Sequence, residues 1–170
     1  MQIATNMWVA GCQSSKTNSK EVIMPEKETL ERARQDEREG KSPSTQAGEF
    51  VREEMDHIRE GKHGARSTKQ AIAIGLSKAR RAGVDLPPPE NGQASESTRK
   101  QAKRDLKKGQ SGTKRTSAKR SRATSRALKR EGRSAASKTA LSRHARSVAA
   151  RRSKASRSRS ARKAAATRKK

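Results

Sequence analysis

The feature that most limits the fold of this chain is its shortage of large apolar side chains. Only 28% of the 170 residues are hydrophobic, and the aromatic residues are one Phe and one Trp, with no Tyr. Aromatic side chains normally supply much of the buried area of a core. With a net charge of +26, this composition excludes a sizeable core and is typical of chains that stay partly disordered when alone.

The charge is unevenly distributed along the chain. Residues 1–96 hold 15 basic and 15 acidic residues, whereas residues 97–170 hold 28 basic and two acidic residues and so carry the entire net charge of +26. We therefore divide the chain into a charge-balanced helical domain at residues 24–88, a Pro/Gly/Ser-rich linker at residues 89–98 and a tail rich in Lys, Arg, Ala and Ser at residues 99–170.

The first 23 residues are interpreted as a dispensable or non-native extension ahead of Met24. The letters "VAGC" at residues 9–12 fit the short motif that precedes a lipidated bacterial cysteine, but the residues before them lack the basic start and continuous apolar stretch of a signal peptide. Cys12 is the single cysteine and cannot form an internal disulfide. No segment approaches the length of an apolar membrane span, so we expect a cytoplasmic protein.

The first predicted helix covers Pro25 to Glu39, where good helix formers are nearly continuous and proline takes a tolerated first-turn position. Its apolar face is thin, because only Leu30 and Ala33 can pack. We expect this helix to be exposed or frayed and to end at Gly40 in the left-handed conformation.

The second predicted helix begins at Ser42 to Ser44 and ends at Gly61. An apolar stripe with the 3.6-residue period runs along it. The stripe consists of Ala47, Phe50, Val51, Met55 and Ile58. The opposite, outer face is acidic and carries Glu49, Glu53, Glu54 and Asp56.

The third predicted helix starts at a capping box formed by Ser67 and Gln70. Ile72, Leu76 and Ala79 share one face. Gly83 followed by Val84 indicates a helix end with its hydrophobic contact, and the prolines that follow prevent continuation.

The tetrapeptide Arg-Glu-Gly-base occurs three times, at residues 38–41, 59–62 and 130–133. We interpret it as a helix end, in which glycine supplies the left-handed turn before the next serine cap. The alternative is that each copy forms a phosphate-binding loop. In the second copy, the backbone amides at the Ser67 cap would receive a phosphate flanked by Lys62, Arg66 and Lys69.

The predicted fold class is mostly α: a small helical hairpin at residues 42–84, or a three-helix domain, followed by a long disordered or conditionally helical basic tail. The segment at residues 136–152 is the part of the tail that we expect to become helical first. Because the core would be small, we expect self-association or a partner. The predicted interaction face consists of Phe50, Val51, Met55, Ile58, Ile72 and Leu76.

Two blocks of the sequence resemble a known protein family. The block "STQAGEFVREEMDHIREGKHGARSTKQAIAIGLSKARRAGV" (Ser44 to Val84), and more loosely "LKREGRSAASKTALSRHARSVAARR" in the tail, resemble a family of small basic bacterial proteins known only as a domain of unknown function. The resemblance implies a bacterial origin and a start at Met24, and it brings no activity, ligand or catalytic residue. The tail is similar in composition to the arms of bacterial histone-like proteins.

The sequence contains no enzyme signature, so we expect no catalytic residue, no cofactor and no small-molecule substrate. His57 and His63 stand six residues apart, near the carboxylates of Asp56 and Glu60. The alternative is a metal site with these carboxylates; we favour a solvated polar pair and expect no metal site.

The tail predicts nonspecific binding to nucleic acid, with duplex DNA favoured over RNA, because its bases suit phosphate contacts and it has no aromatic residue for stacking on bases. We therefore expect a histone-like, nucleoid-associated protein that compacts or bridges DNA. The expected phosphate contacts are Arg99, Lys100, Lys103, Arg104, Lys107, Lys108, Lys114, Arg115, Lys119, Arg120, Arg122, Arg126, Lys129, Arg130, Arg133, Lys138, Arg143, Arg146, Arg151, Arg152, Lys154, Arg157, Arg159, Arg162, Lys163, Arg168, Lys169 and Lys170. Secondary contacts are expected at Lys62, Arg66, Lys69, Lys78, Arg80 and Arg81.

Two other functions stay open. The chain could be an RNA-binding or ribosome-associated protein, because arginine can also stack on bases. It could instead be an adaptor that docks the amphipathic helix at residues 45–60 onto a partner protein.

Overall fold

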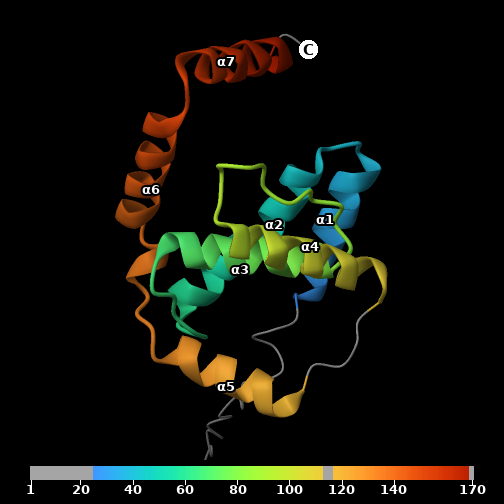
Figure 1. Ribbon diagram of the computed structural model, residues 1–170, viewed down its shortest axis with the longest axis vertical. Helices are drawn as coiled ribbons and strands as arrows, with labels where there is room; N and C mark the ends of the chain where they lie inside the picture. The colour runs from blue at the N-terminus through green and yellow to red at the C-terminus, as the bar shows by residue number, and fades with distance from the viewer. Residues whose placement is uncertain (1–24, 113–116, 169–170) are drawn as a thin grey trace, which may run out of the picture.

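The computed structural model describes residues 25–112 and 117–168, and in these residues it contains helices and connecting segments without a strand (Figure 1). The mostly α fold class is thereby confirmed. The predicted extension at residues 1–23 and the predicted contacts Lys114, Arg115, Lys169 and Lys170 lie outside the described residues. The helices are α1 (Lys27–Arg38), α2 (Pro43–Glu60), α3 (Thr68–Arg81), α4 (Glu96–Gln110), α5 (Ala118–Lys129), the short 3₁₀-helix η1 (Ser134–Ala136), α6 (Lys138–Arg151) and α7 (Lys154–Arg168).

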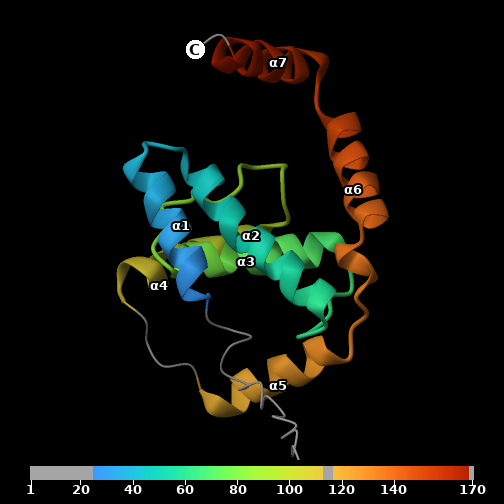
Figure 2. The ribbon, with the colours of Figure 1, turned by 180° about the vertical axis from the view of Figure 1, so that it is seen from behind.

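Helices α2 and α3 form the centre of the molecule, with α1 packed on α2 and α4 packed on α3 (Figures 1 and 2). A glycine allows the two central helices to approach closely. A Cβ atom at Gly75 would lie 2.7 Å from the Cα of Val51 and 3.0 Å from the carbonyl oxygen of Phe50. Because real Cβ atoms are not found at such distances from backbone, Gly75 fixes how near α3 lies to α2.

The first two Arg-Glu-Gly copies end helices as predicted. Gly40 follows α1 with a φ of 69° and Gly61 follows α2 with a φ of 80°, both in the left-handed region. The third copy differs, because Gly132 is not among the glycines with positive φ. At the start of α3, Ser67 Oγ accepts a hydrogen bond from the Gln70 amide as predicted, while Gln70 Oε1 accepts one from the Arg66 amide.

Helix α1 packs on α2, so the expectation that it frays was wrong, whereas most of its residues are exposed as predicted. Thr29 and Ala33 are buried, and the Arg32 guanidinium donates to Glu49 on α2 at 2.8 Å. The apolar face of α1 is as thin as expected, so much of its attachment to α2 comes from hydrogen bonds and ion pairs. Periodicity of apolar residues does not reveal such contacts.

The apolar stripes of α2 and α3 are buried in two clusters. One contains Met55, Ile58, Ala65, Ala71, Ala135 and Ala136, with Val51, Ile72 and Leu141 packed against it. The other contains Ala33, Ala47, Phe50, Ala79 and Val84, with Leu30, Leu76 and Leu86 packed against it. The predicted interaction face, Phe50, Val51, Met55, Ile58, Ile72 and Leu76, therefore lies in the interior or against it rather than on an open surface. This corrects the prediction of an open interaction face, because the chain itself covers Phe50, Met55 and Ile58 and leaves Val51, Ile72 and Leu76 only partly exposed.

Part of the predicted tail belongs to this core. Ala135 and Ala136 are 5% and 0% exposed within the first cluster. Two backbone hydrogen bonds join the segment after α2 to the last turn of α5 and the segment that follows it: the Gly64 amide donates to the Leu128 carbonyl at 2.9 Å, and the Ala65 amide donates to the Gly132 carbonyl at 3.0 Å. The change in charge at residues 97–99 is therefore not a boundary in the packing.

Side chains from the N-terminal half hold the same segment. Thr68 Oγ1 donates to the Ala135 carbonyl at 2.7 Å, and Arg59 Nε donates to the Ala136 carbonyl at 3.1 Å. Helix α4 is attached to α3 by close packing. Gly109 lies directly against the carbonyl oxygen of Arg80, and Ala102 is 4% exposed. We call α1–α4 together with η1 the helical body.

The remaining helices leave this body. Helix α6 rises from η1 and α7 crosses beyond its far end, away from α1–α4, in both views (Figures 1 and 2). The predicted helix at residues 136–152 corresponds to α6 and η1. Where the structure describes the tail, the chain is mainly helical. A tail that is either disordered or conditionally helical was expected, and the disordered form is not confirmed.

Candidate nucleic-acid interface

The basic residues fall into two groups with different surroundings. In the helical body, most of the bases proposed as secondary nucleic-acid contacts are held by acidic or carbonyl groups of the same chain. Lys78 is 2% exposed, and its Nζ lies 2.8 Å from Glu54 Oε2 and 3.3 Å from Glu53 Oε1. Lys78 is therefore an interior counter-ion, and its prediction as a phosphate contact was wrong.

Arg80 and Arg81 also point toward the protein. The Arg80 guanidinium donates to the carbonyl oxygens of Leu86 and Pro87, folding the proline-rich segment back on α3. Burial lowers the pKa of Arg80 from its usual range, as expected for a charged group removed from water. Arg81 Nε donates to the Ser77 carbonyl and lies 3.8 Å from Asp105 of α4. Because only 6% of the surface of Arg80 is exposed, its prediction as a nucleic-acid contact was wrong.

The predicted phosphate loop at the Ser67 cap has mixed support. Arg66 and Lys69 are exposed, but Lys62 is bound to Glu26 at 3.0 Å and to Glu60 at 3.1 Å. Burial alone would lower the pKa of Lys62, and hydrogen bonds to Glu26 and Glu60 outweigh it and raise that pKa. Two amides that a phosphate would need, those of Arg66 and Gln70, already donate within the capping box.

The bases of the C-terminal helices have different surroundings. Helices α6 and α7 contain no acidic residue, and Glu131 is the only acidic residue between residues 118 and 168. No residue of α6 is buried, and every base of α7 is exposed. Their cationic groups therefore cannot be neutralised by carboxylates of their own helices, and they lie in solvent on segments that leave the body.

Some of the tail bases predicted to contact phosphates are instead paired, partly buried or packed within the protein. Lys100 pairs with Glu96 one turn earlier in α4 at 2.6 Å, and Arg99 is half-buried. The Arg133 side chain lies beside Gly61, where an added Cβ would be 3.3 Å from its Nη1. Exposed predicted contacts also remain on α4, at Lys103, Arg104, Lys107 and Lys108, but α4 contains Glu96 and Asp105, whereas α5, α6 and α7 contain no acidic residue. The bases of α5, α6 and α7 therefore best fit a phosphate surface.

The predicted acidic outer face of α2 is not an outer face. Glu53 is 4% exposed and Glu54 is fully buried, whereas Glu49 and Asp56 pair with Arg32 and Arg59. The prediction failed because α1 and α3 cover this side of α2 and Lys78 supplies the compensating charge. Buried carboxylates require such partners.

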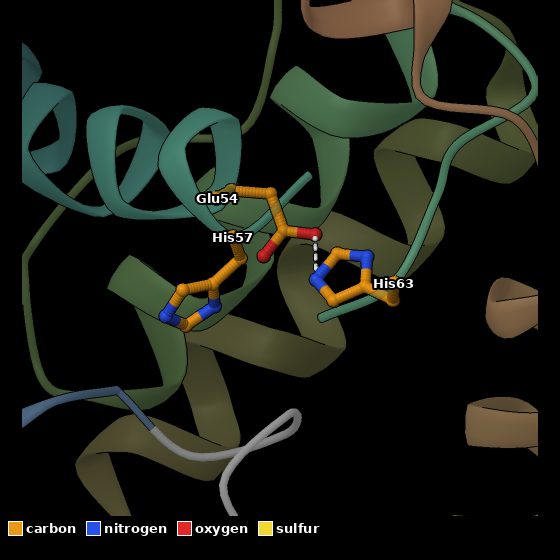
Figure 3. A group of neighbouring side chains, drawn as sticks. All are labelled: Glu54, His57 and His63. Atoms are coloured by element: carbon orange, nitrogen blue, oxygen red, sulfur yellow. Dashed lines mark ion pairs between the residues drawn. The ribbon is translucent and has the colours of Figure 1, made fainter. Parts of the chain in front are cut away.

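His57 and His63 are buried as well, 3% and 2% exposed, so their interpretation as a solvated pair was wrong. Their rings meet edge to face with centroids 6.0 Å apart, and the carboxylate of Glu54 lies between them (Figure 3). His63 Nε2 is 3.3 Å from Glu54 Oε1. One ligand atom from each of the three residues lies within 4.8 Å of the others.

Glu26, just before α1, covers the outer side of this group. Its Oε1 lies 2.8 Å from His57 Nε2 and 3.0 Å from Lys62 Nζ. The hydrogen bonds from His57 and then Lys62 lower the pKa of Glu26 to about 2. The Glu26 amide in turn donates to Glu53 Oε2 at 3.3 Å, which links the start of α1 to the buried carboxylates.

The sequence held a signal for this group that the interpretation passed over. Glu54 and His57 follow Phe50 at the i+4 and i+7 positions of α2, so they lie on the same side of the helix as this apolar residue, which is fully buried. Polar residues on a buried stripe indicate a paired or ligand-binding group, because an unpaired one is costly.

Residues 38–90 match the model of a family of unknown function, DUF6496. This match confirms the resemblance drawn from the block at residues 44–84, and it assigns no activity. The DUF6496 segment contains α2, α3 and the buried Glu54, His57 and His63, whereas Ala135 and Ala136, which complete its core, come from beyond it.

The other comparisons add no relative to the DUF6496 match. Neither the curated proteins nor the solved structures contain a match to the chain. Every helix in the described part of the chain is too short or too polar to span a membrane.

Proposed function

We propose that this protein binds nucleic acid without sequence specificity, with duplex DNA as its main ligand, through the exposed bases of α5, α6 and α7. The observation that carries the proposal is the contrast between the two groups of bases. Several bases of the helical body pair with carboxylates of the same chain, as Lys78 does with Glu53 and Glu54, whereas α6 and α7 contain no acidic residue and extend from the body (Figure 1). A cationic surface of this kind attracts polyphosphates.

The dimensions of α7 suit contact with a duplex. Its 15 residues span roughly 22 Å at about 1.5 Å per residue, and duplex DNA presents one negative charge per ~1.7 Å of axis. The bases of α7 are spaced irregularly and surround the helix axis. They are Lys154, Arg157, Arg159, Arg162, Lys163 and Arg168. Bases on all sides of one helix allow contacts with two duplex segments, which is the geometry of bridging and compaction.

The same residues favour contacts with phosphates over contacts with bases. Phe50, the one aromatic residue in the described part of the chain, is fully buried, so stacking platforms of the kind used by single-strand binders are missing there. Phosphate contacts position a protein on DNA and carry no sequence information. Binding is therefore nonspecific and strongly dependent on salt.

Phosphates also favour the helical state of the tail. Alanine, lysine and arginine are good helix formers, but like charges one turn apart destabilise a helix. Bound DNA screens this repulsion, so we expect the helix content of α5–α7 to increase on binding. The helical body then holds the cationic helices that extend from it. On this proposal the protein is nucleoid-associated and cytoplasmic.

Self-association is no longer needed to complete the core. The expectation of a second copy followed from an underfilled hairpin, and Ala135 and Ala136 of the same chain contribute to that core. Bridging by one molecule is accordingly the simpler arrangement, with two duplexes held by the cationic helices of one tail.

The test is fluorescence anisotropy of the full chain on duplex DNA and on structured RNA of equal length, from about 50 to about 300 mM salt. With about 10 phosphate contacts, log K should fall with log salt with a slope near ~9, and DNA should bind at least as tightly as RNA. Binding to RNA that is tenfold tighter or more would replace the proposal with the RNA alternative. A salt-insensitive affinity would contradict both.

A further inference from the structure

The two buried histidines each use one ring nitrogen and leave the other without a hydrogen bond. His57 Nε2 pairs with Glu26 Oε1 at 2.8 Å, and His63 Nδ1 lies 3.2 Å from the Gly64 carbonyl, to which it must donate because a carbonyl oxygen only accepts. The other nitrogens, His57 Nδ1 and His63 Nε2, are buried and make no hydrogen bond, and the same is true of both oxygens of Glu54.

These atoms face one another as acceptors. With its proton on Nδ1, a neutral His63 presents a lone pair at Nε2 toward Glu54 Oε1, 3.3 Å away. Two acceptors in contact within a buried site repel each other unless a cation lies between them. Glu54 Oε2 lies 2.8 Å from Lys78 Nζ, outside hydrogen-bond geometry but close enough for an ion pair, so Oε1 is the oxygen left for another cation.

The surroundings match those of histidines that bind metals. Such histidines donate their second nitrogen to a carboxylate or a backbone carbonyl, which fixes the tautomer and orients the ring. Here Glu26 takes this role for His57 and the Gly64 carbonyl takes it for His63. The balance of charge is also favourable, because two buried carboxylates at this place, those of Glu53 and Glu54, face one buried ammonium group, that of Lys78.

We propose that Glu54, His57 and His63 form a binding site for one divalent transition-metal ion of the zinc class. Two imidazole nitrogens and one carboxylate oxygen are ligands that zinc accepts, with water in the fourth position. The ligand atoms lie within 4.8 Å of one another, and tetrahedral binding brings such atoms to about 3.3 Å. Side-chain rotation of His57 and His63 toward Glu54 supplies that contraction.

The ion would join two parts of the fold. Glu54 and His57 lie on α2, and His63 lies in the segment whose Gly64 and Ala65 amides bond to the last turn of α5 and to the segment after it. Metal binding therefore stabilises the attachment of the C-terminal half to the helical body. This inference does not depend on the proposed binding of DNA.

The experiment uses full-length protein carrying Cys12→Ser, which removes the single thiol, after treatment with a chelator. Co²⁺ is titrated as a visible probe, followed by competition with Zn²⁺. We expect one ion per chain, the intense visible absorption of a tetrahedral Co²⁺ site, and a higher unfolding temperature. His57→Asn and His63→Asn should abolish this spectrum, and the control His144→Asn, which alters the third histidine on α6, should retain it.

A second set of variants separates ligation from folding. His63→Cys keeps a metal ligand and adds the absorption of a Co²⁺–thiolate bond, whereas His144→Cys does not. Glu26→Gln leaves the three ligands in place and weakens binding about 10- to 100-fold, with unchanged circular dichroism of the metal-free protein. Binding that is equal in all histidine variants, a missing thiolate band in a folded His63→Cys protein, or no one-to-one binding by the parent protein would overturn the proposal. The site would then be bridged by a proton on His63.

Discussion

Gly64 lies directly against the backbone of Glu131, so closely that a Cβ atom at Gly64 would overlap the Glu131 carbonyl oxygen. This contact joins the family-matched segment to the third Arg-Glu-Gly copy, in the half of the chain that the charge pattern set apart as a tail. Residues 128–136 therefore pack as part of the helical body. The exposed cationic part of the chain consists of α5 before this segment and α6 and α7 after it.

Gly64→Ala tests this contact. Overpacking against backbone costs about 1 to 3 kcal/mol, so urea unfolding should show a loss of stability of at least that size. Gly48→Ala is the matched control, because Gly48 is exposed on α2 with nothing within 4 Å of the added Cβ, and alanine there should stabilise α2 by up to about 1 kcal/mol. Equal effects of the two changes would show that the Gly64 contact does not form in solution.

Gly109→Ala tests the docking of α4 on α3 through the sign of its effect. In an undocked helix, alanine is more favourable than glycine by about 1 kcal/mol. In the docked helix the new Cβ meets the Arg80 carbonyl oxygen, so the substitution should destabilise the protein in thermal unfolding. A rise in the unfolding temperature would mean that α4 is free.

Lys78→Met tests the interior charge cluster. Removing the ammonium group leaves Glu53 and Glu54 buried without a counter-ion, and breaking a buried ion pair costs about 3 to 5 kcal/mol. Lys69→Met, on the exposed side of the same helix, should change stability by less than about 0.5 kcal/mol. Chemical denaturation of both variants measures the difference, and a Lys78→Met protein as stable as the control would contradict the buried pairing.

Truncation tests how the chain is divided. A protein ending at Arg152 retains α1–α6 and should unfold cooperatively near the temperature of the full chain. A protein ending at residue 96 loses Ala135 and Ala136 from the core and the backbone bonds to Gly64 and Ala65. We expect it to bind a hydrophobic dye and to give broadened amide resonances. If the protein ending at residue 96 were as stable as the full chain, the domain boundary predicted from the change in charge after residue 96 would be correct.

Local patterns predicted the helices well because the signals lie in adjacent residues. The Ser67 cap, the left-handed Gly61 and the stripe through Phe50 and Ile58 each depend on residues within one or two turns. The mostly α class and the bounds of α2 and α3 followed from these signals. The later helices also carry local signals, and the Ser137 cap of α6 accepts from the Ala140 amide in the same manner.

Contacts between distant segments could not be read in this way. Composition placed Ala135 and Ala136 in a polar tail, yet small residues fit where two segments approach closely and so become core. The same limit hid the site residues: Glu54 and Lys78 each resemble surface charges until the fold brings them to 2.8 Å. The exposure of the bases of α6 and α7 was easier to predict, because these helices contain no acidic residue.

The measurement that tests the proposed function most directly compares two variants of equal net charge. In one, Arg157, Arg159 and Arg162 of α7 are changed to Gln; in the other, the exposed Arg34, Arg38 and Arg52 of α1 and α2 are changed to Gln. Both lose three positive charges, and duplex DNA binding is followed by anisotropy across a salt series. We predict that the α7 variant binds more weakly with a salt slope smaller by about 2 to 3, while the α1/α2 variant keeps the parent slope. Equal slopes in the two variants would show that net charge alone governs binding and would contradict an interface on the C-terminal helices.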